Sequence, residues 1–438
     1  MSLGAATVWF GLSYGVAILG YLAVNAFAAR LLDDTFGYFV IAVTTSTVLG
    51  QLGLIGAHRG GLREAARLET DDVEGLRELR RGVRAVSLVT LPATGLLTAV
   101  VTFSVINEAD SRTRWAVAVG MGILVWFGGQ QKLWANYLRG FGQVRFASLL
   151  EGRSGGALVS LGQGLLVGAV LLFAPGWGLP GALAAVALGF AVPVFFAWRV
   201  VARLWREVGA EGSIFRDVRQ VVTRHWRFAS NMLGGSVNST AEVWLAGLML
   251  ASVDVSLFSA AQRLSILLII PLMSLGVVFS PMVSRLSERD DQRLEKLLRT
   301  GASMAAAITA VLWLPMLIFP GLLLRTIYGD SFGAASLVLV LLTIGSISNV
   351  LTGMCGIALT MSRHEAVVAK VQWIAAGVRV GVGMLAAWQF GSTGLAASAA
   401  AVTTGLSVTL WLLTRQRMGM STHLTLRPNL RLLRQTPG

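Results

Sequence analysis

Four charged residues stand inside long apolar stretches of the sequence, where an isolated charge is unfavourable. They are Lys132, Glu242, Arg263 and Arg379. On membrane-insertion scales a charge at the centre of an apolar helix costs about 2.5–3.5 kcal/mol, so each one calls for a partner or a ligand. A guanidinium serves either purpose, because its fork of N–H groups binds carboxylate or phosphate oxygens in pairs. The residue types therefore predict ion pairing, binding of an anionic group, or both.

Glu242 and Arg263 belong to consecutive apolar stretches and lie at similar depths in them. Glu242 is eight residues before the end of 228–250, and Arg263 is six residues into 257–280. At a helical rise of about 1.5 Å per residue, these depths are about 12 and about 9 Å. We expect a Glu242–Arg263 contact, serving either as a structural ion pair or as a gating or ion-coupling group.

Arg379 and Lys132 are the other two embedded cations. Arg379 is flanked by Gly377 and Gly381, which either leave room around its guanidinium or allow close helix packing. Lys132 lies about 9 Å from the inner end of its stretch, near enough for its ammonium to reach the membrane surface.

Two further arginines, Arg30 and Arg59, end the first two apolar stretches. We expect them at the level of the lipid headgroups, and a place at the mouth of a cavity is the alternative. The candidate anion-binding residues are therefore Arg263, Arg379, Lys132, Arg30 and Arg59, with Glu242 as the ion-pair or coupling residue.

The composition explains how these residues are positioned. Of the 438 residues 55% are hydrophobic and 13% are charged, whereas a soluble domain carries about 25% charged residues. The apolar residues form stretches of about 20 residues, each long enough to cross a ~30 Å hydrocarbon layer as a helix. The fold class predicted is all-α integral membrane, with about twelve transmembrane helices. The expected spans are 5–28, 35–57, 85–107, 115–138, 154–173, 181–198, 228–250, 257–280, 301–320, 333–358, 371–390 and 394–414.

The basic residues are distributed unequally between alternate connections. One set of connections, which includes both termini, holds 29 of the 36 Lys and Arg residues, and the other set holds four. Because basic loops stay in the cytoplasm, this bias predicts an inner-membrane protein with both termini cytoplasmic. The same loops account for the net charge of +14, so nucleic-acid binding is not expected.

The two halves of the chain repeat in the same direction. GLPGALAAVA (178–187) matches GSTGLAASAA (391–400) at four of ten positions, and two further pairs match in the same order, close to half the chain apart. Parallel repeats predict two six-helix lobes around a central cavity, an arrangement typical of alternating access. The expected boundaries are 1–214 for the first lobe, 215–414 for the second and 415–438 for a basic cytoplasmic tail.

Two cytoplasmic segments, 71–86 and 287–299, carry mixed charge at helical spacing. In the first, Asp71 and Glu74 have the spacing of a capping box. We interpret both segments as interfacial helices, with coupling to a partner as the alternative.

Enzymatic classes lack support in the sequence. The single cysteine, Cys355, excludes an internal disulfide, and the four histidines lack metal-ligand spacing. No Gly-rich loop ends in Lys-Ser or Lys-Thr, and the longest connection in the basic-poor set is the twelve residues 321–332. We expect no catalytic residue, no metal, no cofactor and no enzymatic activity.

Three segments carry a resemblance to a known family. They are LFSAAQRLSILLIIPLMSLGVVFSPMVSRL (257–286), IYGDSFGAAS (327–336) and GIALTMSRHEAVVAK (356–370). Together they resemble the polysaccharide-transport family, the flippases of O-antigen and capsule repeat units within the multidrug/oligosaccharidyl-lipid/polysaccharide exporter superfamily.

The resemblance implies a flippase that moves a polyprenyl-diphosphate-linked oligosaccharide from the inner to the outer leaflet by alternating access. Its partners would be this lipid-linked substrate, membrane lipids, and glycosyltransferases or a polymerase of the same pathway. The alternative is a cation-coupled multidrug exporter of the same superfamily. Such exporters bind cations through embedded carboxylates, and the first six expected spans contain no acidic residue. We expect the neutral amides to line the sugar path or to bond neighbouring helices: Asn25, Gln51, Gln130, Gln131, Asn231, Asn238 and Gln262.

Overall fold

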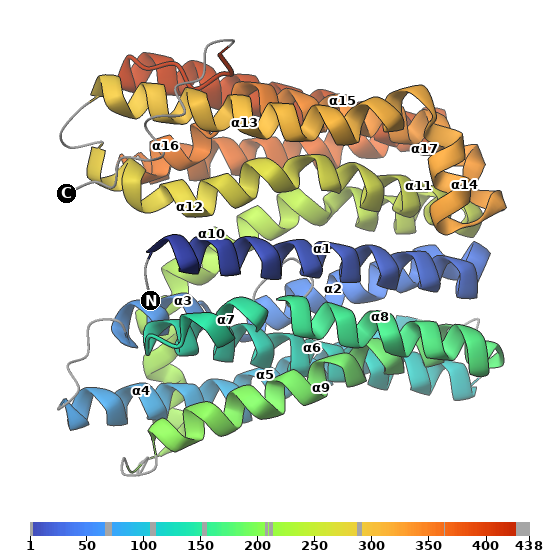
Figure 1. Cartoon of the computed structure of the whole chain (residues 1–438). Helices are drawn as coiled ribbons and strands as arrows, with labels where there is room; N and C mark the ends of the chain where they lie inside the picture. Colours follow the sequence, from blue (N-terminus) through green and yellow to red (C-terminus); the bar gives the residue numbers. More distant parts are fainter. Residues whose placement is uncertain are drawn as a thin grey trace. The chain divides into compact units, whose positions relative to one another are not determined.

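The computed structural model describes residues 3–65, 72–105, 111–150, 156–205, 209, 213–286, 291–362 and 364–425. Throughout this part of the chain the regular structure is helical, with no strand. Each of the twelve expected spans falls largely on helix, which confirms the all-α prediction (Figure 1). Eight helical stretches of the described residues are long and apolar enough to cross a membrane. Of these, Gly15–Gly53 overlaps two of the expected spans, and Ala366–Met418 contains two.

The chain divides into two compact units, Met1–Ser236 and Val237–Gly438. The division falls inside α10 (Ile214–Met249), beyond the boundary at 214/215 expected from the sequence. The first part of α10 belongs to unit 1 because it packs against other helices of that unit. The remaining helices of unit 1 are α1 (Leu3–Leu32), α2 (Phe36–Gly53), α3 (Ala57–Ala65), α4 (Val73–Ala85), α5 (Leu91–Val105), α6 (Ser111–Gly140), α7 (Val144–Leu150), α8 (Gly156–Phe173) and α9 (Gly178–Leu204).

Small residues bring the spanning helices of unit 1 together. A Cβ on Gly20 of α1 would lie 2.7 Å from the backbone of Ser160 on α8. Between α5 and α6, a Cβ on either Gly95 or Gly122 would lie 2.8 Å from the carbonyl oxygen of the other. Such contacts fit the use of glycine at helix interfaces in lipid, where close backbone packing replaces the hydrophobic driving force.

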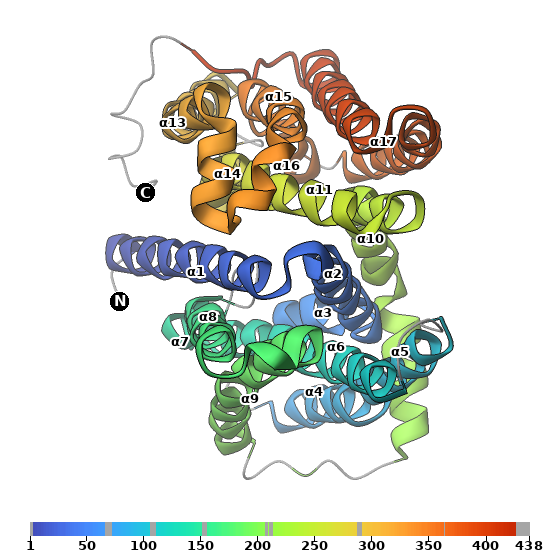
Figure 2. The same cartoon turned by 90° about the vertical axis from the view of Figure 1, so that its right-hand side faces the viewer.

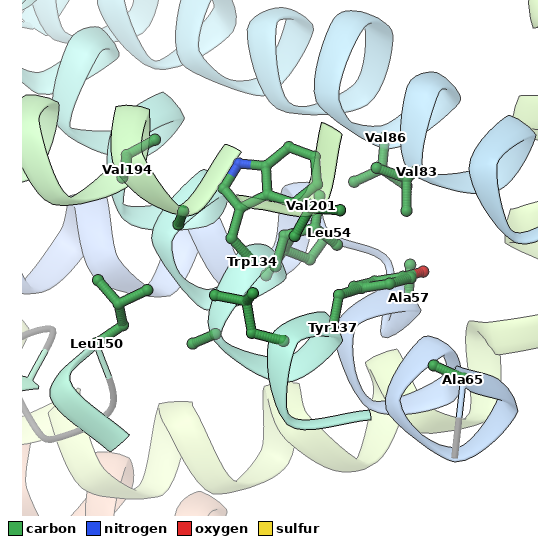
Figure 3. Packing of buried hydrophobic residues seen from close by; sticks show 14 of the residues in the cluster. Leu54, Ala57, Ala65, Val83, Val86, Trp134, Tyr137, Leu150, Val194 and Val201 are labelled. Carbon is green, nitrogen blue, oxygen red and sulfur yellow. The ribbon is translucent and has the colours of Figure 1, made fainter. Parts of the chain in front are cut away.

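A cluster of buried hydrophobic side chains packs together at one end of unit 1. Trp134 and Tyr137 of α6 pack with Leu54 and with Val201 of α9 (Figure 3). The ring of Trp205 meets both aromatic rings edge-on, with centroids 6.1 Å from Trp134 and 6.4 Å from Tyr137. Aromatic side chains bury large areas, so this cluster holds α3, α4, α6 and α9 at their shared end.

The expected helix over 71–86 is present as α4. Asp72 is its N-cap, and the carboxylate accepts a hydrogen bond from the backbone N–H of Gly75 at 2.9 Å. The capping residue is thus one position later than expected, and Asp71 lies outside the described residues. Leu79 and Val83 are buried along the inner face of the helix, and the π-helical turn η2 (Val86–Thr90) leads directly into α5. The second expected helix is the start of α13, while 287–290 lie outside the described residues.

In unit 2, α17 (Glu365–Met418) consists of two helices that meet at Gly391 (Figures 1 and 2). Gly391 has φ 59° and ψ −143°, a conformation that L residues avoid. The break coincides with the expected connection 391–393. The other helices of unit 2 are α11 (Ser252–Ser265), α12 (Ile270–Leu286), α13 (Asp291–Ile318), α14 (Pro320–Tyr328), α15 (Ser336–Thr352) and α16 (Cys355–Met361). Short 3-10 turns complete the chain at η1 (Asp33–Thr35), η3 (Pro175–Trp177), η4 (Ile266–Ile269) and η5 (Asp330–Ala335).

After α17 the chain turns at Gly419 and returns onto unit 2 as a segment, 419–425, that we term the strap. The hydroxyl of Thr422 donates to the carbonyl of Thr352 at 2.9 Å, and the N–H of Leu424 donates to the carbonyl of Leu351 at 3.2 Å. Trp411 Nε1–H donates to Nδ1 of His423 at 3.3 Å. The strap therefore ties the ends of α15 and α17 together.

Candidate functional site

A buried polar cluster in unit 2 centres on Arg379, in the first half of α17. The guanidinium forms an ion pair with Glu242 through Nη1 and Oε1. Nε donates to Asn238 Oδ1 at 3.0 Å, and Nη2 donates to Thr403 Oγ1 at 3.1 Å. Arg379 is 7% exposed and Glu242 is 5% exposed. Each nitrogen of the guanidinium thus has an oxygen partner in an environment that excludes water.

The helices explain how these partners meet. Asn238 and Glu242 are four residues apart on α10, so they lie one turn apart on the same face. Thr403 comes from the second half of α17, which returns beside the first half after the turn at Gly391. One arginine therefore joins α10 to both halves of α17.

The ion pair differs from the one expected from the sequence. Glu242 was expected to contact Arg263, and the partner that the structure gives it is Arg379. Arg263 lies on α11, half-buried between the buried residues Gln262 and Leu264. Helical rise places Glu242 and Arg263 at similar depths, but depth does not determine the direction in which a side chain points.

The two glycines beside Arg379 have a smaller role than either expectation gave them. A Cβ on Gly377 or on Gly381 would meet nothing within 4 Å. Neither glycine lies at a close helix contact, and the guanidinium is surrounded by its own polar partners.

The other candidate cations are placed as follows. Lys132 is half-buried on α6 of unit 1, and its backbone carbonyl accepts a hydrogen bond from Asn136 at 2.8 Å. Arg30 is exposed in the last turn of α1, where a cation complements the helix dipole. The backbone of Arg59 belongs to α3, and its side chain lies outside the described residues.

Most of the embedded amides bond to neighbouring backbone or hydroxyl groups. Gln130 both donates to and accepts from Ser87 at 3.2 Å, and Gln131 donates to the carbonyl of Leu150. Asn25 donates to the carbonyl of Tyr21 at 2.7 Å. Gln130 and Gln131 therefore connect α6 to neighbouring elements, whereas Asn25 bonds within α1. Gln51 accepts from Ser236, Gln262 is buried, and the side chain of Asn231 lies outside the described residues.

A second charged cluster, which sequence reasoning missed, joins α4 to the first half of α10. Arg84 pairs with Asp217 at 3.3 Å, and Arg224 pairs with Glu78 at 2.7 Å. Glu78, Asp217 and Arg224 line a cavity of about 20 Å³ together with Tyr137 and other residues of α3, α4 and α10. The two partners in each pair are more than 130 residues apart in sequence, so local spacing gave no signal of the cluster.

Buried His225 belongs to the same cluster. A Cβ on Gly60 of α3 would overlap its ring, which explains the glycine at that position. Burial lowers the pKa of His225, and the neighbouring Arg224 lowers it further. His225 is therefore neutral near pH 7. Among the described residues, no group of three His, Cys, Asp or Glu side chains is placed to hold a metal ion.

No protein-family model matches the chain, and no curated protein matches it at the sequence level. Solved structures match it over nearly its whole length. One is an inward-facing multidrug resistance MATE family transporter of the MOP superfamily, with TM-score 0.69, 17% identity, and coverage of 92% of this chain and 94% of that chain. The chain has the fold of the MOP superfamily.

Two other structures support the assignment. The lipid II flippase MurJ, in an inward closed conformation, matches with TM-score 0.71 and 11% identity, covering 93% of this chain and 87% of that chain. A MOP superfamily transporter from Pyrococcus furiosus, described as having a binding pocket of reverse polarity, matches with TM-score 0.55 and 16% identity over 94% of this chain and 95% of that chain. The apolar helices and this fold identify the chain as a multi-pass membrane protein.

Proposed function

We propose that the protein is a flippase that carries a polyprenyl-diphosphate-linked oligosaccharide from the inner to the outer leaflet by alternating access. The observation that carries this proposal is the sign of the embedded charge. The spanning helices α1, α2, α5, α6, α8 and α9 of unit 1 contain no acidic residue. In the twelve expected spans, Glu242 is the only carboxylate against three cations.

The excess of positive charge suits an anionic substrate. Glu242 is paired with Arg379, and the other two embedded cations are Lys132 on α6 and Arg263 on α11. In a medium of low dielectric constant, each cation binds phosphate oxygens more strongly than it would in water. We assign the diphosphate to Arg263, with Lys132 and Arg379 assisting and with Arg30 and Arg59 near the membrane surface.

The membrane potential supplies a driving force without a nucleotide-hydrolysing domain. Moving one positive charge inward through the full potential is favoured by about 2.3 kcal/mol per 100 mV. An empty cationic cavity therefore returns inward after the substrate leaves. This scheme places the protein in the inner membrane with both termini cytoplasmic, beside the glycosyltransferases or polymerase of its pathway. The lobes at 1–214 and 215–414 and the tail at 415–438 belong to the same proposal.

A second function, cation-coupled drug export, is favoured by one observation. Glu242 is a buried carboxylate at the centre of a polar cluster, and MATE transporters share the fold. In that case Glu242 would exchange Arg379 for a proton or a metal cation.

One experiment separates the two functions. Purified protein is reconstituted in vesicles, and the leaflet exchange of a polyprenyl-diphosphate glycan is measured with and without an imposed inside-negative potential. We expect exchange that is accelerated by the potential and strongly reduced by Arg263→Gln. Wild-type rates from Arg263→Gln, or transport of cationic dyes in place of the glycan, would support the exporter instead.

A further inference from the structure

The first half of α10 lies across its unit rather than along the spanning helices. In both views its ribbon runs at a steep angle to α6 and α9 of unit 1 (Figures 1 and 2). It lies within the basic connection between the sixth and seventh expected spans, at the same end of unit 1 as α4. A helix in this position has the orientation of an interfacial helix, with its axis along the membrane surface.

One face of this helix segment is fixed to unit 1. Asp217, Val221 and His225 follow one another at intervals of four residues, and all three are buried. Asp217 pairs with Arg84 of α4, and Arg224 beside this face pairs with Glu78. These contacts determine which side of the helix points away from the protein.

The opposite face combines apolar and basic side chains. Phe215 is 75% exposed and Val222 is 38% exposed, and they lie on one flank of that face. Arg216 and Arg219 are exposed beside them. The separation of apolar from basic positions around one helix is the pattern of a segment that inserts its apolar flank below the headgroups and holds its cations among them.

We propose that the Phe215–Val222 face of α10 binds anionic phospholipid headgroups of the cytoplasmic leaflet through Arg216 and Arg219. Charge complementarity identifies the occupant. A zwitterionic headgroup offers no net attraction to two arginines, whereas an anionic headgroup offers about a fivefold preference per arginine near the surface. The proposal concerns a lipid site outside the substrate path, so it is independent of the proposed transport function.

The arginines of α4 provide a matched control. Arg77 and Arg81 are also on the surface of unit 1, and both pair with Glu74, at 3.5 and 3.2 Å. Replacing them removes the same two charges from the chain as replacing Arg216 and Arg219. Because Glu74 already neutralises part of their charge, they have less attraction to offer an anionic lipid.

The test measures which lipid lies beside α10 in the full-length protein. Thr223 is exposed on the same face, and a fluorophore is attached through Thr223→Cys in a Cys355→Ser background. Its quenching by brominated phosphatidylglycerol is compared with its quenching by brominated phosphatidylcholine at equal mole fraction. We expect stronger quenching by phosphatidylglycerol, a preference that declines with salt because exposed charges are screened over about 8 Å at physiological ionic strength.

Two pairs of substitutions test whether Arg216 and Arg219 cause the lipid preference. Arg216→Gln with Arg219→Gln is expected to reduce the preference to near equality, whereas Arg77→Gln with Arg81→Gln leaves most of it. Equal quenching by the two lipids in the unmodified sequence would overturn the proposal, and so would a preference that survives the first pair of substitutions. All four arginines are at least partly exposed, so monodisperse protein is expected from each variant and serves as the folding control.

Discussion

Removing the carboxylate of Glu242 should destabilise unit 2 because it leaves the buried guanidinium of Arg379 without its counter-charge. Breaking a buried pair by removing one partner costs about 3–5 kcal/mol. Glu242→Gln keeps the volume of the side chain, and Arg379 retains its bonds to Asn238 and Thr403. The expected loss is therefore at the lower end, ~3 kcal/mol. Arg379→Gln removes all three contacts and strands a buried carboxylate, so ~4–5 kcal/mol is expected.

The double variant Glu242→Gln with Arg379→Gln should lose less than the sum of the single losses. Two neutral amides avoid an uncompensated charge, so we expect a coupling free energy of about 2–3 kcal/mol between the positions. The assay is the free energy of unfolding of the purified protein in mixed micelles, titrated with a denaturing detergent. The four proteins of the cycle are measured under the same conditions.

A second cycle with Arg263→Gln serves as the control for the partner expected from the sequence. We expect Glu242→Gln and Arg263→Gln to be close to additive, within about 0.5 kcal/mol. Additive losses for Glu242 and Arg379, together with strong coupling of Glu242 to Arg263, would refute the ion pair described here. A transport assay adds a further distinction: Arg379→Lys should rescue only part of the Arg379→Gln defect, because the ammonium lacks the guanidinium fork.

Three other predictions concern the membrane topology, the strap and the N-cap of α4. In a Cys355→Ser background, a membrane-impermeant thiol reagent should label exposed Ala334→Cys but not exposed Gln220→Cys in intact cells, and the opposite pattern would overturn the topology. Nδ1 of His423 accepts a hydrogen bond from Trp411, which requires that nitrogen to be unprotonated. Burial lowers the pKa of His423 from its ordinary 6.5. Arg299 and Arg415 lower the pKa further, against the opposing effect of Glu295. Because the folded pKa is depressed, docking of the strap is complete above the ordinary pKa and weakens as pH falls through the folded value. Amide hydrogen exchange of 419–425 should therefore become faster in mild acid in the native sequence, and should depend less on pH in His423→Gln. An equal pH dependence in both proteins would exclude His423 as the cause. Finally, Asp72→Ala should cost about 1 kcal/mol and increase exchange in the first turn of α4, since it removes the N-cap, whereas Asp72→Asn should keep most of the protection.

The helices were predictable wherever the local signal was strong. The turn between 371–390 and 394–414 was visible in the sequence as a Gly-Ser-Thr-Gly segment, and the structure breaks α17 there, at Gly391. The expected span 333–358 is one apolar stretch in the sequence, but the structure divides it into α15 and α16. At that break Gly353 has φ 80°, and a Cβ on it would lie 2.2 Å from the carbonyl oxygen of Thr422 in the strap. This contact joins residues far apart in the chain, so no local pattern reports it.

In the candidate site, too, the sequence identified the residues but not the contact between them. Hydropathy identified Glu242 and Arg379 as embedded charges, because their cost in an apolar environment does not depend on the partner. Pairing does depend on which helices are neighbours and on the azimuth of each residue, which advances by about 100° per position along a helix. Asn238 shares the face of Glu242, and that face is directed at α17.

The pairing also changes how the embedded charges are counted toward an anionic substrate. Three embedded cations and one carboxylate give a net charge of +2, whichever arginine forms the ion pair with Glu242. Pairing Glu242 with Arg263 would have left the excess on Lys132 and Arg379, and Arg379 is closed in by Asn238 and Thr403 as well. The structure pairs Glu242 with Arg379, and Lys132 of α6 and Arg263 of α11 are the other two embedded cations. For a diphosphate carried by alternating access, a cation contributes only if it binds the phosphate differently in the two conformations, because a ligand shifts a conformational equilibrium only through such a difference.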